Sequence, residues 1–334
     1  MKKFNNFKIL FLLLFLISIF ISNSFINKFE GEIFKTNSYT YSSLIHEDTI
    51  SYFESAQKIS KDLNDGKSYF SSGETYKFTF LYPRIIHLFN QFINSDSLII
   101  DDLNKKISLK NYKIFIYFQI IIYFFSVLFL RLKLSKFLDQ NLVNIVAITL
   151  LLNPILMQWH LTILTESIFL SFLIVLTSLS INPRNNSHFF VIGLFIGILY
   201  TQRTIAFLYP LVFIFFIFLF KENYLKRFSK FLSLAVGFSL ILIFIGLHNL
   251  KRADIFYFTP IQSKTDLQTY LEPHILSKSQ NLNKEEINIF FEERSQNILK
   301  NNNFNLNIER DRINFFNQIR NKSIENIFKN KIIT

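Results

Sequence analysis

Seven hydrophobic runs, separated by polar segments, form the main pattern of this 334-residue chain. Each run approaches the length of about 20 apolar residues that a helix needs to cross the hydrocarbon core of a bilayer. The runs cover about 9–26, 113–130, 142–158, 162–181, 189–201, 204–220 and 231–249. The pattern therefore predicts an all-α polytopic membrane protein with about seven transmembrane helices.

Three of these runs have more than one interpretation. One long helix could cover 189–220, but the polar stretch Thr201-Gln202-Arg203-Thr204 in its middle favours two short crossings. The first run follows the basic start Met1-Lys2-Lys3, as a signal peptide would, yet it ends without an Ala-x-Ala-like cleavage site. An uncleaved anchor with a cytoplasmic N-terminus is the expectation.

Two long polar segments, 27–112 and 251–334, flank the hydrophobic runs. The first is predicted to be a large loop containing amphipathic helices. One of these helices has a single apolar stripe, made of Tyr52, Ala56, Ile59 and Leu63. The second segment has helical periodicity at Ile313, Phe316, Ile319 and Ile324. The predicted domains are a transmembrane domain, 1–250, and a helical polar segment, 251–334.

The positions of Lys and Arg in the short connections predict the topology. With the N-terminus inside, three connections return to the cytoplasm, and each carries basic residues. These residues are Arg131, Lys133 and Lys136, then Arg184, then Lys221, Lys226, Arg227 and Lys230. The chain is therefore predicted to be a multi-pass protein of the bacterial inner or plasma membrane. In this topology, 27–112 and 251–334 both lie on the outer, periplasmic face.

Composition limits the chemistry available to the chain. It has no Cys, which excludes disulfides, thiol catalysis and thiolate metal sites. The net charge of +12 is assigned to cytoplasmic loops and to contact with the lipid bilayer, because no nucleic-acid-binding motif accompanies it. The six His lack metal-ligand spacing, so no metal site is predicted. A divalent metal between Glu47, Asp48 and a His stays an open alternative.

The stretch His46-Glu47-Asp48 is the first candidate for chemistry on the outer face. It immediately precedes the amphipathic helix described above. Acidic residues favour the positive end of a helix dipole, so a purely structural helix start is one interpretation. The other is that one carboxylate is a general base held at the membrane surface. Neighbouring residues on a helix point about 100° apart, so Glu47 and Asp48 need not act as a pair.

Three further polar groups lie at the outer membrane edge. Arg84, after Tyr82-Pro83, is either a cation that reaches the lipid surface or a ligand for substrate. Glu166 lies near the outer end of its run, where a carboxylate is costly and faces the protein interior. Arg203 lies between two short apolar runs and is either an interfacial anchor or a phosphate ligand.

Taken together, these motifs resemble the membrane-embedded GT-C glycosyltransferases, which include the protein O-mannosyltransferases and the lipid A aminoarabinose transferase. The resemblance covers roughly residues 8–330. It rests on short motifs in a shared order: Asp48-Thr49-Ile50-Ser51-Tyr52-Phe53-Glu54-Ser55-Ala56, Tyr82-Pro83, Asn153-Pro154, Leu164-Thr165-Glu166-Ser167, Gly193 and Gly197 before Arg203, and Pro210.

The resemblance implies that a sugar moves from a polyprenyl-phosphate carrier to a glycan, lipid or protein acceptor on the outer face. Asp48 would deprotonate the acceptor hydroxyl, and Glu47 is the second candidate for that role. Arg203, and with it Arg84, would neutralise the departing phosphate, while Glu166 would organise the pocket. His46 matches no family role. Tyr82 and His46 are further candidate substrate contacts.

The chain departs from the family in two respects, of which the unmatched His46 is one. The other is span number: GT-C enzymes generally have more spans than seven, and Arg312 through Lys329 is similar to a family helix that leads into a further span. The resemblance therefore implies either a continuation beyond Thr334 or a reduced member of the family. Other functions stay open: a non-catalytic polytopic envelope protein, a lipid-linked glycan transporter, or another outer-face transferase such as an acyltransferase or a polymer ligase.

Overall fold

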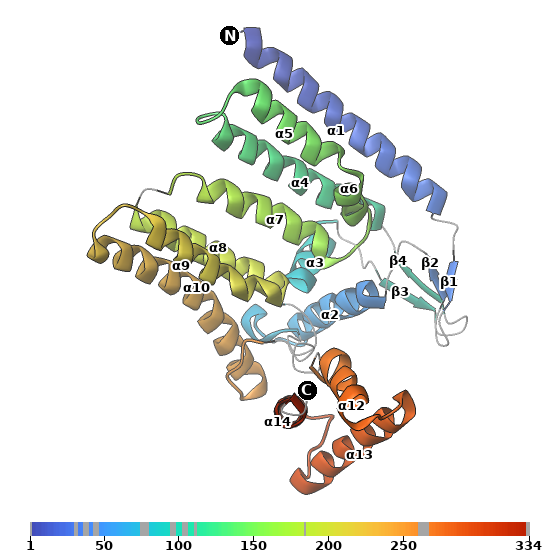
Figure 1. Cartoon of the computed structure of the whole chain (residues 1–334). Helices are drawn as coiled ribbons and strands as arrows, with labels where there is room; N and C mark the ends of the chain where they lie inside the picture. Colours follow the sequence, from blue (N-terminus) through green and yellow to red (C-terminus); the bar gives the residue numbers. More distant parts are fainter. Residues whose placement is uncertain are drawn as a thin grey trace. The chain divides into compact units, whose positions relative to one another are not determined.

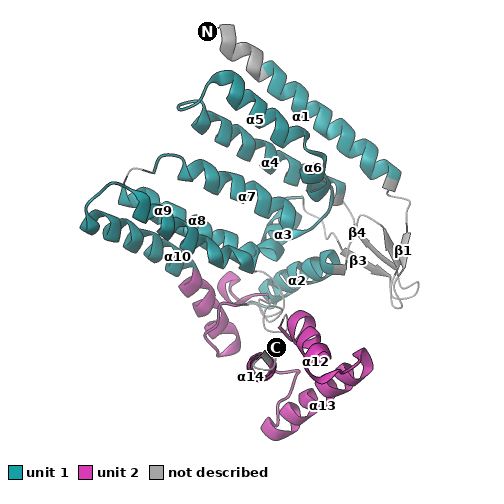
Figure 2. Ribbon diagram, viewed as in Figure 1, with its two compact units in different colours: residues 1–66, 80–241 teal, residues 67–79, 242–334 magenta. Residues whose placement is uncertain are grey.

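The computed structural model describes residues 2–29, 33–35, 40–42, 47–73, 80–93, 98–101, 106–109, 112–183, 185–259 and 267–331. The chain forms two compact units, coloured separately in Figure 2. Unit 1 contains residues 1–66 and 80–241, and unit 2 contains 67–79 and 242–334. Both are predominantly helical, as the sequence predicts.

Unit 1 contains a series of apolar helices and the polar loop that follows the first of them (Figure 1). Its helices are α1 (Lys2–Phe29), α2 (Glu47–Asn64), α3 (Leu81–Phe92), α4 (Tyr112–Leu134), α5 (Gln140–Leu152), α6 (Pro154–Leu161), α7 (Thr165–Ser180), α8 (Asn186–Gln202), the short 3₁₀ helix η2 (Thr204–Leu208), α9 (Tyr209–Leu219) and the first part of α10 (Tyr224–Ala253).

Three described helices are long and apolar enough to cross a membrane: Ile9–Lys28 of α1, Lys113–Leu134 of α4, and α10. The pair α5–α6, bent by 46°, could be a fourth crossing. The remaining apolar helices, among them Thr165–Ser180 and Thr204–Leu219, are shorter. A membrane protein is therefore supported, although these lengths leave the count of seven crossings as a prediction.

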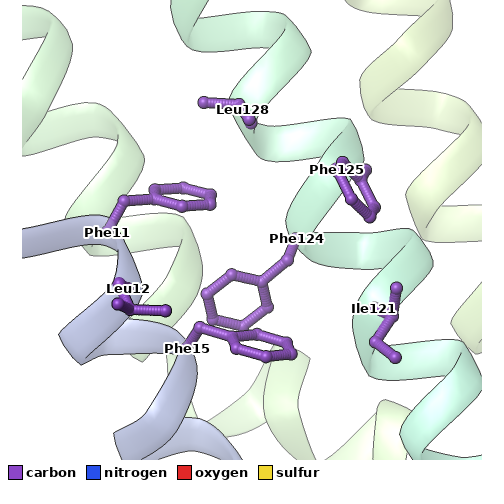
Figure 3. A pocket seen from close by; sticks show the side chains of 7 residues that line it. All are labelled: Phe11, Leu12, Phe15, Ile121, Phe124, Phe125 and Leu128. Atoms are coloured by element: carbon purple, nitrogen blue, oxygen red, sulfur yellow. The ribbon is translucent and has the colours of Figure 1, made fainter. Parts of the chain in front are cut away.

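Large apolar side chains are exposed along α1, as expected for a helix that faces lipid rather than water. Leu12 is 57% exposed and Phe20 is 73% exposed. Phe11 and Phe15 of α1 pack edge-on against Phe124 of α4, with ring centroids 5.4 and 5.0 Å apart. Figure 3 shows the apolar pocket of about 330 Å³ that these rings help to line. Such surfaces are compatible with hydrocarbon surroundings.

The break between α5 and α6 has a clear local cause. Pro154 cannot donate a backbone hydrogen bond, so α5 does not continue through it and ends at Leu152. Asn153 then starts α6, because its Oδ1 accepts hydrogen bonds from the backbone N–H groups of Ile155 and Leu156. The new helix brings Trp159 and His160 to the turn that precedes α7.

Glycines allow α8 to approach α10 within unit 1. A side chain at Gly193 would overlap the backbone oxygen of Leu234, and one at Gly237 would overlap the backbone oxygen of Phe190. Small residues at such crossings are typical of helix packing in membranes. The close approach fixes the course of α8, which ends one residue before Arg203.

The polar loop 27–112 contains a small sheet in addition to the predicted helices. Its strands are β1 (Ile33–Lys35), β2 (Thr40–Ser42), β3 (Leu98–Asp101) and β4 (Lys106–Leu109), in the order β1-β2-β4-β3. The hairpins β1–β2 and β3–β4 are antiparallel, and β2 pairs with β4 in parallel. Strands of three or four residues are too short to produce a clear alternating pattern, which explains why the sequence does not predict them.

Unit 2 contains η1 (Tyr69–Ser71), the end of α10, the π-helical turn η3 (Leu267–Leu271), α12 (Glu272–Gln280), α13 (Lys284–Asn302) and α14 (Glu309–Lys331). The predicted helical periodicity of this segment is confirmed, since Ile313 and Ile319 are buried and Phe316 packs beside them. Arg252, at the end of α10, donates to Glu309 Oε2 at 2.6 Å and to the Tyr257 hydroxyl at 3.1 Å.

A buried ion pair joins the last three helices of unit 2. Arg294 of α13 donates to both carboxylate oxygens of Glu272, at 2.6 and 3.1 Å, and to Ser323 of α14 at 3.3 Å. Asn326 adds a further bond to Glu272 at 2.9 Å. Glu272 is completely buried, so its charge depends on these partners.

Glu272→Gln should destabilise unit 2 by roughly 3 kcal/mol, because it leaves the buried Arg294 charge without its carboxylate. The measurement is the urea concentration at which trypsin begins to cleave residues 267–331 in the full chain. Glu325→Gln, which removes the exposed partner of Lys322, is the matched control and should change nothing measurable. Equal urea midpoints for Glu272→Gln and wild type would contradict the prediction.

Candidate functional site

The first turn of α2 is attached to the turn between α6 and α7. The Thr49 hydroxyl, which is fully buried, donates to the backbone oxygen of Ile163 at 2.9 Å. The predicted apolar stripe of α2 points inward, since Tyr52, Ala56 and Ile59 are all buried. Asp48, one residue before Thr49, is exposed. The helix therefore holds its acidic start beside the α6–α7 turn.

Tyr52 lies where the predicted site residues meet. Burial raises the pKa of its hydroxyl above the usual value, and the charge of Asp48 raises it further. A hydrogen bond with Thr165 and the charge of Arg203 act in the opposite direction, while Glu166 adds to the increase. These side chains therefore lie close enough to influence one phenol, which stays protonated at neutral pH.

Glu166 and Arg203 form an ion pair across the site. Arg203 Nη1 donates to Glu166 Oε1 at 2.5 Å, and the Thr165 hydroxyl donates to Glu166 Oε2 at 3.2 Å. The side chain of Arg203 is 42% exposed and that of Glu166 is 22% exposed. Water and a solvated ligand can therefore reach the guanidinium. Arg203 also has five N–H donors, more than this single bond uses.

Local backbone structure explains the position of Arg203. Its backbone is extended (φ −145°, ψ 129°), which ends α8 at Gln202. The chain then makes the 3₁₀ turn η2 and restarts as α9, with Pro210 in the first turn. The polar stretch thus divides 189–220 into two helices, as the sequence favours, and places Arg203 at the break.

A chain of hydrogen bonds that starts at Tyr82, next to Tyr52, joins α3, α4 and the α6–α7 turn. The rings of Tyr52 and Tyr82 pack edge-to-face with centroids 5.0 Å apart. The buried Tyr82 hydroxyl donates to Gln119 Oε1 at 2.9 Å. Gln119 Nε2 in turn donates to the backbone oxygens of His160 and Thr162, at 3.2 and 3.0 Å. Tyr82 is therefore part of the support of the site.

Arg84 makes contacts within its own part of the chain. It is buried, it donates to the backbone oxygen of Phe80 at 3.0 Å, and its guanidinium lies 3.7 Å from the centre of the Phe80 ring. Burial lowers the pKa of His87 below the usual value, and the charge of Arg84 lowers it further. These contacts favour a role in fixing the start of α3 over the exposed position expected from the sequence.

The other two predicted residues are only partly covered by the structure. His46 lies outside the described residues, and Glu47 is described only as the first residue of α2, without its side chain. Within the part of the chain that the structure describes, no three His, Asp or Glu side chains gather as a metal site would require. The alternative of a metal between Glu47, Asp48 and a His depends in part on the Glu47 side chain, which lies outside what the structure describes.

Three residues of the site carry signals that sequence reasoning missed. Gln119 is an amide within an apolar run, which is itself an indication of an interior polar site. Tyr52 belongs to the apolar stripe of α2, and helical periodicity gives no sign of a role for its hydroxyl. Gln202, beside Arg203, is fully buried, and neither polar atom of its amide has a hydrogen-bond partner. Such a group is rare, and a ligand or ordered water commonly satisfies it.

No family model, curated protein or solved structure matches this chain. The function must therefore be argued from the site itself. Its elements are one exposed carboxylate, one accessible guanidinium paired with a second carboxylate, and a protonated phenol, brought together by α2, α7 and the α8–η2 break.

Proposed function

We propose that the chain is a membrane glycosyltransferase that moves a sugar from a polyprenyl-phosphate carrier to an acceptor hydroxyl on the outer face. The observation that carries the proposal is that Asp48, Glu166 and Arg203 all act electrostatically on the Tyr52 hydroxyl, with Glu166 and Arg203 paired to each other. Position 48 and position 203 are far apart in sequence and have opposite charges. A base and a phosphate-binding cation are the two groups that this transfer requires.

Asp48 removes the proton from the acceptor hydroxyl in this mechanism. The acceptor oxygen forms a bond to the anomeric carbon as the proton passes to the carboxylate. A carboxylate is a weak base at neutral pH, but the demand is modest when the proton moves late in a transition state that resembles an oxocarbenium ion. The exposure of Asp48 leaves room for an acceptor to approach.

Arg203 stabilises the leaving group. As the bond between the anomeric carbon and the phosphate oxygen breaks, its electron pair goes to the polyprenyl phosphate, where negative charge increases. A guanidinium can bind two phosphate oxygens at once, which makes it well suited to this role. Glu166 and Thr165 hold Arg203 in place, and the neutral Tyr52 hydroxyl shares a hydrogen bond with Thr165 that supports this arrangement.

Seven crossings and an outer-face site are part of the proposal. The crossings are α1, α4, the bent pair α5–α6, α7, α8, η2–α9 and α10. A helix such as α7, with 16 residues, has a length of about 24 Å and would require local thinning of the bilayer. The basic connections α4–α5 and α9–α10 lie along one edge of unit 1, while α2 and α3 lie toward the opposite edge (Figure 1), which supports this topology.

The test uses the full chain in proteoliposomes loaded with an acceptor-containing membrane extract. Radiolabelled sugar is supplied on polyprenyl phosphate, and covalent transfer and movement across the bilayer are measured separately. The proposal predicts label in acceptor and release of polyprenyl phosphate. Label that crosses the bilayer while still attached to its carrier would instead identify a transporter. Absence of both covalent transfer and movement across the bilayer would indicate a non-catalytic envelope protein.

A further inference from the structure

Unit 2 has a polar groove that the transfer mechanism does not use. The groove has a volume of about 640 Å³ and lies where η3, α12 and α13 meet. That volume falls in the range of roughly 300 to 1,000 Å³ that is typical of small-molecule sites. The side chains that give it its chemistry are Gln268, Tyr270, His274, Lys284, Asn288 and Phe291.

The walls of this groove are fixed to one another. Glu272, the first residue of α12, forms the buried ion pair with Arg294 of α13, so the two helices that line the groove are joined beneath it. The third wall is η3, a single π-helical turn that continues directly into α12. Turns of this kind are rare and occur frequently at functional sites. A rigid support of this type is what a binding site requires.

The lining combines aromatic rings with amides. Tyr270 is 75% exposed, so the face of its ring is accessible, and Phe291 is half-buried at the same groove. Aromatic rings have a negative face that attracts the polarised C–H groups of a sugar ring. Gln268 and Asn288 each offer both donors and an acceptor, as sugar hydroxyls do. The aromatic rings therefore match the C–H face of a pyranose, and the amides match its hydroxyl groups.

The charge of the groove selects among sugars. Lys284 and His274 line it, and among the described lining residues there is no carboxylate. The nearby Glu286 is turned toward the helix start, where its Oε2 accepts from the backbone N–H of Asn283 at 2.8 Å. We propose that this groove binds an oligosaccharide that contains acidic sugars. If the chain transfers sugars as proposed above, this oligosaccharide is part of the acceptor, but binding does not depend on transfer.

The test is calorimetric titration of the full chain in nanodiscs with two probes. One is an acidic hexasaccharide of alternating uronic acid and N-acetylhexosamine, and the other is a neutral glucose hexamer. The acidic probe should bind more tightly. Tyr270→Ala should weaken the binding of both probes by about tenfold, whereas Tyr270→Phe should retain most of the affinity. Lys284→Ala should weaken the acidic probe alone, by about threefold to tenfold.

The matched control is Tyr224→Ala, which removes an equally exposed tyrosine from α10 in unit 1 and should leave binding unchanged. Trypsin resistance of residues 267–331 verifies that each variant is folded. Absence of binding by both probes at millimolar concentration would overturn the proposal, as would equal affinity of Tyr270→Ala and wild type. Asp48→Asn should bind the acidic probe normally, so a failure of the groove and a failure of the transfer mechanism are distinguishable.

Discussion

Asp48→Asn should reduce sugar transfer by about 10² to 10⁴-fold, the range typical of a lost general base. Asparagine has nearly the same shape as aspartate but cannot accept the proton of the acceptor hydroxyl. Because Asp48 is exposed and Thr49 makes the buried bond to Ile163, the substitution should leave α2 in place. The variant should therefore insert into membranes at wild-type abundance and still bind donor.

Initial rates of transfer, measured at saturating donor and acceptor, test this expectation. The matched control is Glu54→Gln, which neutralises another exposed carboxylate of α2. It should retain wild-type rates. Full activity in Asp48→Asn would contradict the assignment of this residue as the base. If Glu47→Gln abolished activity instead, the base would be the neighbouring carboxylate.

Arg203→Ala should lower kcat/KM for the donor by about 10³-fold, since it removes the cation that stabilises the departing phosphate. Arg203→Lys should recover only part of this loss, because an ammonium group cannot bind two phosphate oxygens in the fixed geometry of a guanidinium. Glu166→Gln should have a smaller effect, since Arg203 would keep its charge while losing a positioning partner.

Initial rates of transfer, measured over a range of donor concentrations, give kcat/KM for each of these three variants. Arg310→Ala, which removes an exposed arginine of α14, is the matched control and should be silent. If Arg203→Lys restored wild-type kcat/KM, Arg203 would act only as a general positive charge. If Arg203→Ala were fully active, it would be an interfacial anchor, as one interpretation of the sequence holds.

Much of the helical structure could be predicted from the sequence, because apolar run length and periodicity depend on local composition. The stripe of α2, the helices of unit 2 and the break at Arg203 are all visible in this way. The four short strands are not, since each is too short to show alternation and the pairing that joins the two hairpins, between β2 and β4, links segments more than 50 residues apart in sequence. The contacts of Arg84 are not visible either, because burial against Phe80 depends on tertiary packing.

The site itself was only partly predictable. Asp48 is visible in the sequence as an acidic helix start, and Glu166 and Arg203 as polar groups at the ends of apolar runs; in the structure all three act electrostatically on Tyr52. The hydrogen bonds that support these residues cannot be predicted from the sequence. Thr49 with Ile163, and Tyr82 with Gln119, join residues 114 and 37 positions apart, and sequence periodicity contains no information about such pairs.

Asp48 and Arg203 lie in one site on the outer face according to this proposal, and cysteine labelling reports directly the face on which each residue lies. The natural chain has no Cys, so single substitutions can be labelled without background. In intact right-side-out vesicles, a membrane-impermeant maleimide should label Asp48→Cys and Arg203→Cys, whereas Lys136→Cys and Lys226→Cys should react only after permeabilisation. Labelling of positions 48 and 203 from opposite faces, or only from the inner face, would contradict a shared site on the outer face.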